Sequence, residues 1–371
     1  MKFTIAKEQM LTGLQAVQSI VGSRTTLPIL SNVLLKTGEG VLELTATDLD
    51  VTITCAVPAE VHKAGLTTLP VRKLFGIVRE MGMGDLDFEV DEKNRCSLRM
   101  GPSFYKIHGL AGEEFPPVPQ FKEEGKVVVE QKKMKTLLRR TCFAASTEEA
   151  RYVLNGIFLS LKEHKLTMVA TDGRRLALAE EELEGSGKAQ AEFIIPNKAV
   201  NELGRLLGES GTVEIFYTEN QAGFQMVNEG ATAPVRVVTK LIEGNYPNYR
   251  MVIPAETKER IQLEREEFLH ALRRAEIVTS DKQNSVKLCF GKNTLTITAN
   301  TPDVGEGTEN IAIKYEGEEM AIAFNPGFII QPLNALDDQQ DIFLEFTNDM
   351  SPGLLKINGP FLYVVMPMRL Q

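Results

Sequence analysis

The feature that most constrains this chain is an internal repeat, in which the same order of short patterns occurs three times. A strand-like run followed by apolar residues at helical spacing begins at residues 3, 127 and 261. Farther along, a second strand pattern recurs with its shared alanine at positions 46, 170 and 299. Later in each copy, an apolar strand leads into a helix from residues 68, 193 and 322. Three landmarks in one order indicate a repeat of roughly 125 residues, so the fold is built from three similar units.

The repeat divides the chain into three domains. A chain of 371 residues has room for two or three domains of ordinary size, and the repeat selects three. We place them at residues 1–123, 124–254 and 255–371. With 43% hydrophobic and 25% charged residues, the composition is that of a globular protein whose units can each build a core.

Each unit is predicted to be an α+β domain. It opens with a short strand (K-F-T-I, K-V-V-V or R-I-Q-L) that passes directly into a helix, whose apolar residues gather on one face. Alternating or apolar runs bounded by turn residues then favour antiparallel strands. A second helix is expected at 71–81, 197–207 and 326–336. We therefore expect two helices on one face of an antiparallel sheet in each copy.

Proline-rich segments join the units. Residues 114–119 read E-F-P-P-V-P, and residues 246–254 begin with Y-P-N-Y and end in Pro254. Proline fixes φ and stiffens such connections. We expect the three units to follow one another in a defined curve.

Basic residues gather on the predicted helices, although the chain carries a net charge of −9. They are Arg72, Lys73, Arg79, Lys132, Lys133, Lys135, Arg139, Arg140, Arg265, Arg273 and Arg274. Acidic residues gather elsewhere, as at 85–92, 180–184 and 316–319. This polarisation favours a surface that follows a DNA backbone over an ordinary solvated face. Because no base-reading motif is present, we expect DNA contacts to be independent of sequence.

No pattern of a catalytic site is found. Phosphate-binding loops, dinucleotide fingerprints, zinc-protease motifs and nucleophile elbows are all missing from the sequence. The nearest approach to a reactive cluster is Asp172 beside Arg174 and Arg175. The same A-T-D pattern recurs at 46–48, so we interpret Asp172 as the end of a strand whose carboxylate accepts hydrogen bonds from local amides. We expect no intrinsic catalytic activity.

Neither a metal, a cofactor nor a membrane is indicated. The four Cys and four His are scattered, and none stands at the spacing of a metal site. The chain starts without an apolar leader, and no apolar run approaches the length of a membrane span. We expect a cytoplasmic protein.

Several segments give the whole chain a resemblance to the bacterial sliding clamps, the beta subunits of DNA polymerase III. The segments that carry the resemblance lie in all three units and in the family's order. They are M-K-F-T-I at the start, T-L-P-I-L-S-N-V-L-L at 26–35, R-Y-V-L-N-G at 151–156, A-T-D-G-R-R-L-A at 170–177, Y-P-N-Y-R at 246–250 and Y-V-V-M-P-M-R-L at 363–370.

The resemblance implies a fold and a function. The family's DNA-clamp (processivity-fold) domains form a head-to-tail homodimer, a ring of six domains with helices inside and sheets outside. Such a ring encircles duplex DNA without sequence specificity and slides along it. The resemblance therefore implies that the chain is a processivity factor and an accessory subunit of the polymerase III holoenzyme. Its partners would be the replicative polymerase alpha subunit, the clamp-loader subunits and other proteins with a clamp-binding motif.

The resemblance also implies three sets of site residues. A hydrophobic peptide-binding pocket between the second and third domains would use Leu154, Thr171, Gly173, Arg174, Arg175, Leu176, Pro247, Met251, Val252, Val364, Met366, Pro367, Met368, Arg369 and Leu370. DNA would be contacted by Arg24, Arg72, Lys73, Arg151, Tyr152 and Lys198. The dimer interface would use Tyr105, Ile107, Ile277 and Val278, which are equally compatible with ordinary core positions.

Two departures and two alternatives remain. Arg174 and Met251 differ from residues of well-known members, which implies a different peptide preference, and Gln371 extends past the usual terminal Leu. One alternative is a phosphoryl-transfer or hydrolytic enzyme that uses Asp172, Arg174 and Arg175. The other is a clamp-fold interaction scaffold that does not encircle DNA.

Overall fold

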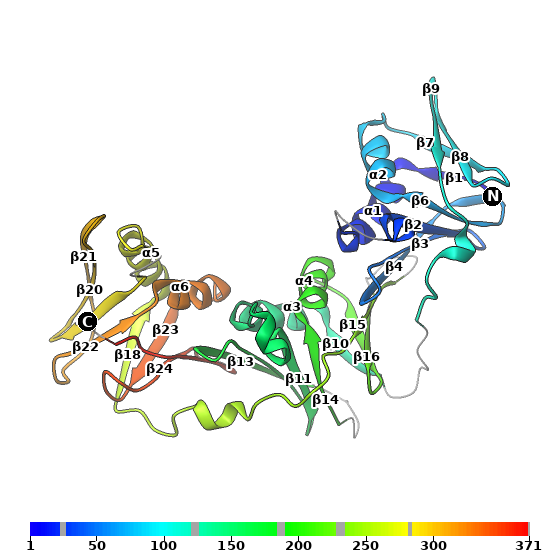
Figure 1. Ribbon diagram of the computed structural model, residues 1–371. Coiled ribbons are helices and arrows are strands. Elements are labelled where there is room, and N and C mark those ends of the chain that lie inside the picture. The colour runs from blue at the N-terminus through cyan, green and yellow to red at the C-terminus, as the bar shows by residue number, and fades with distance from the viewer. Residues whose placement is uncertain (23–26, 120–125, 184–189, 228–233, 281–283, 370–371) are drawn as a thin grey trace. The chain divides into compact units, whose positions relative to one another are not determined.

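The computed structural model describes the chain except for residues 23–26, 120–125, 184–189, 228–233, 281–283 and 370–371 (Figure 1). The chain forms two compact units. Unit 1 consists of Met1–Lys135 and Lys198–Leu241, and unit 2 consists of Thr136–Asn197 and Ile242–Gln371. Each unit therefore takes part of the second sequence repeat.

Unit 1 contains an eight-stranded sheet and a five-stranded sheet, both antiparallel. The larger has the order β10-β15-β16-β17-β4-β3-β2-β6, and the smaller has the order β5-β1-β7-β8-β9. The strands of the larger sheet are β2 (Asn32–Thr37), β3 (Val41–Thr47), β4 (Val51–Pro58), β6 (Leu66–Pro70), β10 (Val127–Glu130), β15 (Thr212–Tyr217), β16 (Gln221–Val227) and β17 (Val235–Lys240). Those of the smaller are β1 (Lys2–Ala6), β5 (Glu60–Lys63), β7 (Asp85–Val90), β8 (Arg95–Met100) and β9 (Ser103–His108).

Unit 2 repeats this arrangement. Its eight-stranded sheet has the order β14-β11-β12-β13-β25-β24-β23-β18, and its four-stranded sheet has the order β21-β20-β19-β22. The strands of the larger sheet are β11 (Gly156–Lys162), β12 (Lys165–Thr171), β13 (Arg175–Glu182), β14 (Ala191–Pro196), β18 (Glu259–Glu264), β23 (Asp341–Phe346), β24 (Gly353–Lys356) and β25 (Phe361–Val365). Those of the smaller are β19 (Val286–Gly291), β20 (Thr294–Thr301), β21 (Gly305–Ala312) and β22 (Met320–Phe324).

Two α-helices occur at the same places in each repeat, and the sequence prediction of them is confirmed. They are α1 (Lys7–Val17), α2 (Val71–Glu80), α3 (Gln131–Thr141), α4 (Asn197–Leu206), α5 (Arg265–Glu276) and α6 (Pro326–Ala335). In α2, Val71, Leu74 and Val78 lie on one buried face, as the apolar spacing predicts. The start of α5 is fixed by Glu264, whose carboxylate accepts hydrogen bonds from the backbone amides of Glu266 and Glu267.

Short 3-10 helices lie between these elements. They are η1 (Gln18–Ile20), η2 (Pro28–Ser31), η3 (Gly112–Glu114), η4 (Cys142–Ala144), η5 (Glu149–Leu154) and η6 (Tyr249–Val252). η3 and η6 belong to the two predicted linkers. In Figure 1 the linker that contains η6 runs along the face of the large sheet of unit 2 opposite to α5 and α6.

The sequence did not predict that neighbouring repeats share a sheet. In unit 1, β4 of the first repeat pairs with β17 of the second, so that Ile53 lies opposite Val237. In unit 2, β13 of the second repeat pairs in the same way with β25 of the third. Each pairing satisfies the backbone groups that a separate four-stranded sheet would leave at its edge.

The joint between repeats is reinforced on the helical side of unit 1. Near the end of α4, Arg205 donates hydrogen bonds to the carbonyl oxygens of Gln15 (3.0 Å) and Ala16 (2.7 Å) near the end of α1. A cation there complements the negative end of the α1 dipole. Ser19 also donates to Glu202 of α4 at 2.6 Å. The first and second repeats are therefore joined through helices as well as strands.

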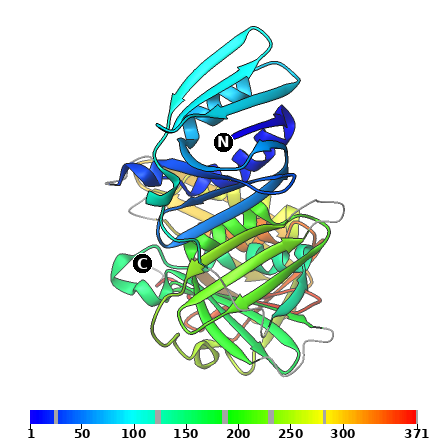
Figure 2. The same ribbon diagram turned by 90° about the vertical axis from the view of Figure 1, so that its right-hand side faces the viewer.

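The smaller sheets end in strands with one unpaired side. Among the described residues, β9 pairs with β8 alone, and β21 pairs with β20 alone. Figure 2 shows the cyan strands of the N-terminal sheet extending away from the rest of unit 1. These two strands carry free backbone donors and acceptors that another strand can use.

Candidate partner-binding site and charged surfaces

The centre of the candidate site is the turn that joins β12 to β13. Thr171 donates to the carbonyl oxygen of Arg175 (2.6 Å) and accepts from the amide of Gly173 (3.1 Å). Asp172 accepts from the amides of Arg174 (2.9 Å) and Arg175 (3.1 Å). Gly173 has a φ of +85°, which a residue without a Cβ adopts easily. The interpretation of Asp172 as part of a structural turn is confirmed.

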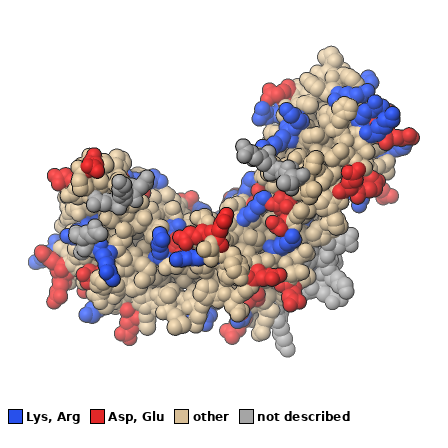
Figure 3. All heavy atoms as spheres, viewed as in Figure 1, with Lys and Arg blue, Asp and Glu red and all other residues tan. Residues whose placement is uncertain are grey.

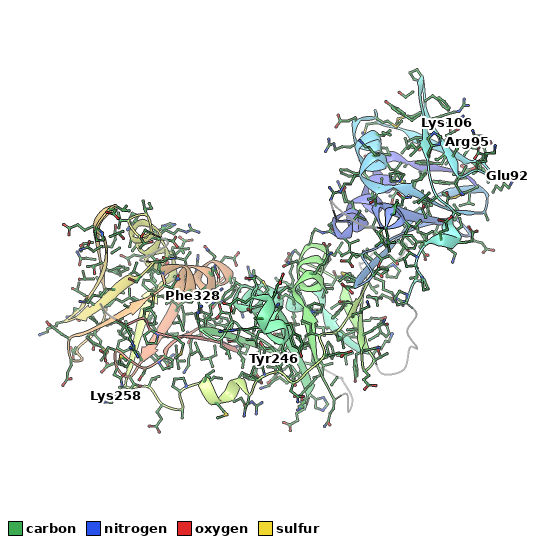
Figure 4. The ribbon with its side chains drawn as sticks, viewed as in Figure 1. Glu92, Arg95, Lys106, Tyr246, Lys258 and Phe328 are labelled. Carbon is green, nitrogen blue, oxygen red and sulfur yellow. The ribbon has the colours of Figure 1, made fainter. Side chains whose placement is uncertain are left out.

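Arg175 points into unit 2 and supports this turn from within. The residue is only 9% exposed. Its guanidinium donates to Asp172 (2.9 Å), to the carbonyl oxygen of Phe143 (2.7 Å) and to Gln331. It also lies over the ring of Phe328 in α6, which Figure 4 labels. Because its donors are used inside the fold, Arg175 positions the turn, whereas the sequence placed it among the partner contacts.

Two other arginines lie on the surface beside the turn. Arg151 donates to the carbonyl oxygen of Asp172 at 2.6 Å and pairs with Glu148 at 3.3 Å. Arg174 is exposed and lies 3.8 Å from the other oxygen of Glu148. The structure thus brings Arg151, which the sequence assigned to DNA, to the candidate partner site.

Apolar side chains form the floor next to the turn. Val169, Leu176, Leu354 and Val364 are buried together, and Tyr246 packs against them from the linker. Because successive side chains of a strand alternate between faces, Val364 lies on the linker side while Tyr363 lies on the α6 side. Tyr363 donates there to the carbonyl oxygen of Phe328 at 2.6 Å. Burial raises the pKa of both tyrosines, so each stays a neutral phenol.

Methionines and a valine flank this floor on the surface. Met251 is 81% exposed, and Val252, Met366 and Met368 are also exposed. The C-terminal segment is held by its backbone, since the amide of Met366 donates to Arg174 (2.9 Å) and that of Met368 donates to Ala323 (2.8 Å). A fixed backbone with exposed, adaptable thioether side chains is suited to contact with apolar groups.

The remaining predicted residues of the site lie at its borders. Leu154 and Pro367 are half-buried, while Pro247 and Arg369 are exposed. Leu370 lies outside the described residues. The site therefore draws on three segments that are distant in sequence, namely the β12–β13 turn, the linker with η6 and the chain after β25. All three belong to unit 2.

Comparison with known proteins gives the family. The sequence matches the N-terminal domain of the DNA polymerase III beta subunit over residues 1–119. It matches the central domain of that subunit over residues 128–248 and the C-terminal domain over residues 250–369. The chain belongs to the DNA polymerase III beta subunit family. The family that the sequence predicted is confirmed, and so is its repeated clamp-domain fold.

Individual clamps resemble the chain over its whole length. The beta sliding clamp of Escherichia coli K12 is 34% identical over 376 residues, with 100% of both chains covered. A crystal structure of the Bacillus subtilis clamp superimposes with a TM-score of 0.94 at 29% identity, covering 100% of both chains. The Bartonella birtlesii clamp, bound to griselimycin, gives a TM-score of 0.93 at 32% identity, again with 100% of both chains covered.

The basic residues expected at DNA lie at the starts of helices. Arg72 and Lys73 are exposed in the first turn of α2, and Lys198 is exposed at the corresponding place in α4. Arg72 donates to the carbonyl oxygen of Val21 at 2.9 Å, and Lys198 forms an ion pair with Asp48. Within the described residues, Lys73 makes no ion pair. Tyr152 is exposed on η5, and Arg24 lies outside the described residues.

The predicted separation of charges is incomplete in the clamp. Arg139 and Arg140 of α3 pair with Asp337 and Asp338 beyond the end of α6. Figure 3 shows acidic side chains next to basic ones on the face that it presents. The prediction of Arg265 as part of an exposed basic face is wrong, since this residue is 6% exposed and donates to the carbonyl oxygens of Leu333 and Gln339. The ion pairs of Arg139 and Arg140 join α3 to the segment after α6, a contact that helical spacing alone does not reveal.

The residues expected at the dimer interface divide between surface and core. Tyr105 of β9 is exposed and Ile277 is 75% exposed, whereas Ile107 is 8% exposed and Val278 is half-buried. The sequence reasoning missed two exposed apolar residues nearby, Phe104 on β9 and Val304 before β21. The alternation of side chains along the strand at 103–108 could have revealed Phe104. It places Phe104 and the buried Ile107 on opposite faces of the strand.

Two searches of the described residues were negative. No group of three or more His, Cys, Asp or Glu side chains is arranged there to hold a metal ion. No helix in the described part is long and apolar enough to cross a membrane.

The four cysteines are free thiols, and burial raises the pKa of Cys55 to about 11.

Proposed function

We propose that this chain is the sliding clamp of its replicative DNA polymerase. In this role it encircles duplex DNA without sequence specificity and tethers the polymerase, which raises the effective concentration of the enzyme at the template. The observation that carries the proposal is the match of all three repeats to the three domains of the beta subunit, in order and over almost the whole chain. The role is that of an accessory subunit of the polymerase III holoenzyme in the cytoplasm.

The open edges of β9 and β21 support the proposal of a ring. We infer that β9 of one copy pairs with β21 of a second copy, and that the same contact at the other side closes a head-to-tail ring. Tyr105 and Phe104 would meet Ile277 and Val304 at this joint, which would bury apolar side chains that the single chain exposes. A heterologous contact that closes after two copies yields a ring rather than a filament. The domain boundaries at 123/124 and 254/255 stay a prediction.

Light scattering during size-exclusion chromatography tests the ring. A species of about twice the chain mass of 41.1 kDa is expected. Tyr105→Asp should convert it to single chains, because a charge in an apolar joint loses its hydration. Glu92→Asp is a matched control at an exposed position before β8. A monomer for the unmodified chain at micromolar concentration would contradict the head-to-tail assembly.

The candidate partner site is proposed to bind a short hydrophobic peptide from the polymerase alpha subunit, the clamp loader and other clamp-binding proteins. Its buried floor of Leu176 and Val364 and its exposed Met251, Met366 and Met368 supply apolar contacts. Arg174 is an exposed cation beside them and would fix a polar group of the peptide. The Bartonella birtlesii clamp, which binds griselimycin, shows that a relative with this fold holds a ligand.

The alternative is a clamp-fold scaffold that binds proteins but does not encircle DNA. The ion pair between Lys198 and Asp48 gives this alternative some support, because it partly neutralises a predicted DNA contact. Lys73 favours the clamp, since within the described residues its charge has no protein partner and is available to a phosphate. The two functions differ in whether the protein stays on circular DNA.

A further inference from the structure

The linker between the first and second repeats covers a cavity in unit 1. The cavity has a volume of about 560 Å³ and lies between the large sheet and the linker segment that ends in Pro116, Pro117, Val118 and Pro119. Leu34, Thr54, Ala56 and Arg236 form part of its wall on the sheet side. This volume falls within the usual range of small-ligand sites. No predicted site residue lines it.

Strand register shows that this place corresponds to a filled place in unit 2. In unit 1, Leu34 lies opposite Thr45, Thr45 opposite Thr54, and Thr54 opposite Arg236. In unit 2, the same row reads Phe158, Val169, Leu178 and Leu362. Side chains opposite one another across a sheet point to the same face. The cavity of unit 1 thus occupies the position of the apolar cluster under the linker of unit 2.

The two places differ in what the linker supplies. In unit 2 the ring of Tyr246 stacks on Phe158 with centroids 5.1 Å apart, and its hydroxyl donates to the carbonyl oxygen of Val169 at 3.4 Å. Tyr249 adds a second ring 6.0 Å from Phe158. In unit 1, Leu34 and Thr54 replace Phe158 and Leu178. The linker there supplies the ring of Phe115, which precedes a proline as Tyr246 does, but it has Val118 where the other linker has Tyr249. Smaller side chains on the sheet, and Val118 in place of a second aromatic residue in the linker, leave room for one aromatic ring.

Arg236 gives the cavity a cation that lacks an acidic partner. Its guanidinium donates twice to the side-chain oxygen of Gln225, at 3.2 and 2.8 Å. Gln225 in turn donates to Glu214, whose other oxygen accepts from Lys126. In the described part of the chain no carboxylate pairs with Arg236, although this residue is half-buried. A neutral amide thus holds the guanidinium in place, and a carboxylate would form a stronger, charge-assisted bond with it.

The other charges of the wall limit the choice of ligand. Lys36 lies opposite Glu43 in the strand register, so these two charges offset each other in part. Glu113 of the linker adds one more negative charge. A ligand with one carboxylate can reach Arg236, whereas a ligand with several would meet Glu43 and Glu113.

We propose that this cavity binds a peptide segment that presents an aromatic side chain next to a single carboxylate. The ring would fill the space over Leu34, Thr54 and Ala56 beneath the linker prolines, in the manner of Tyr249 in unit 2. The carboxylate would bind the guanidinium of Arg236. The clamp would thus carry a second peptide site, distinct from the one in unit 2 and different in its chemistry.

A cycle of two probes and two proteins tests this assignment. The probes are acetyl-Tyr-Asp-amide and its uncharged analogue acetyl-Tyr-Asn-amide, titrated into the full-length protein and followed by saturation-transfer NMR. Arg236→Leu introduces the residue that unit 2 has at this register, so the strand keeps a side chain that suits it. We expect the Asp probe to bind the unmodified protein about tenfold more tightly than the Asn probe, and this preference to vanish in Arg236→Leu.

Two further variants separate the cavity from other surfaces. Ala56→Phe fills the cavity and should abolish binding of both probes. Lys240→Ala removes an exposed cation of β17 that does not line the cavity and should leave both affinities unchanged. The same titrations on a chain that ends at Val365 exclude binding at the site in unit 2. Equal affinity for the two probes, or full binding to Ala56→Phe, overturns the proposal. Loss of DNA retention in any variant would count against the proposed function and not against the cavity as a peptide site. The two proposals are therefore tested separately.

Discussion

The guanidinium of Arg175 lies 4.5 Å from the centre of the Phe328 ring. Arg175 belongs to β13 of the second repeat, and Phe328 belongs to α6 of the third. The contact therefore links two repeats directly behind the candidate partner site. It also separates the adjacent arginines by role, since Arg174 is exposed while Arg175 is buried.

Arg175→Ala should destabilise unit 2 by about 3 kcal/mol, because it leaves the Asp172 carboxylate and two other acceptors without their donor. Urea unfolding followed by circular dichroism measures this loss. Arg174→Ala is the matched control and should change the free energy of unfolding by less than about 0.5 kcal/mol. Equal stability of the two variants would show that Arg175 does not support the turn.

Ending the chain at Val365 should abolish binding of a polymerase peptide while the assembly of two chains persists. The deleted residues include Met366 and Met368, which supply exposed apolar side chains. Among the residues that the structure describes, the deleted backbone gives up two hydrogen bonds, to the carbonyl oxygens of Arg174 and Ala323. Calorimetric titration measures the affinity, and light scattering measures the mass. Unchanged affinity would remove this segment from the site.

Lys73→Ala should reduce the salt dependence of binding to a short DNA duplex. Each phosphate contact contributes about 0.9 to the slope of log K against log salt, so the slope should fall by about that amount. Fluorescence anisotropy across a salt series measures it. Arg79→Ala, at the other end of α2, removes a cation that already pairs with Glu80 and should leave the slope unchanged. A smaller effect of the Lys73 change than of the Arg79 change would argue against α2 as a DNA contact.

The pairing of α3 with the segment after α6 should weaken in acid. Burial tends to raise the pKa of Asp338, but the charge of Arg140, hydrogen bonds to the carboxylate and the charge of Arg139 together outweigh it and hold this pKa below its ordinary value. The stabilisation is therefore complete above the unfolded-state pKa of about 3.9 and is lost as the pH falls through the lower folded-state value.

Asp338→Asn should consequently flatten the fall in unfolding free energy between about pH 6 and about pH 3. Urea unfolding at several pH values measures this slope. The difference between the two proteins should shrink in about 1 M salt, because exposed charges are screened there. A steeper acid loss in the variant would contradict the assigned direction.

Local patterns in the sequence predicted the fold well where the information is local. The helix predicted at 197–207 is observed as α4, and the turn at Asp172 has the amide contacts that its Asp indicated. Pairing between repeats was not predictable from local patterns, since the residues of β4 do not indicate that β17 is the neighbouring strand. Long-range hydrogen bonds depend on the folded arrangement and leave no periodic signal.

The same limit explains the errors at the candidate site. Arg174 and Arg175 are adjacent in sequence and identical in chemistry, so their opposite orientations emerge only from strand alternation after Thr171. Arg265 stands first in a helix with basic residues, yet its side chain turns inward to the end of α6. Burial of a charged side chain is decided by acceptors far away in sequence.

Retention on a DNA circle shows whether this protein encircles DNA. The protein is loaded with the proposed clamp loader and ATP onto a nicked circular plasmid. Gel filtration in high salt removes unbound protein, and the plasmid is then cut at one site. We expect the protein to stay with the intact circle and to leave within minutes of the cut, because a ring is linked to DNA topologically. Equal retention before and after the cut, or none on the intact circle, would contradict it.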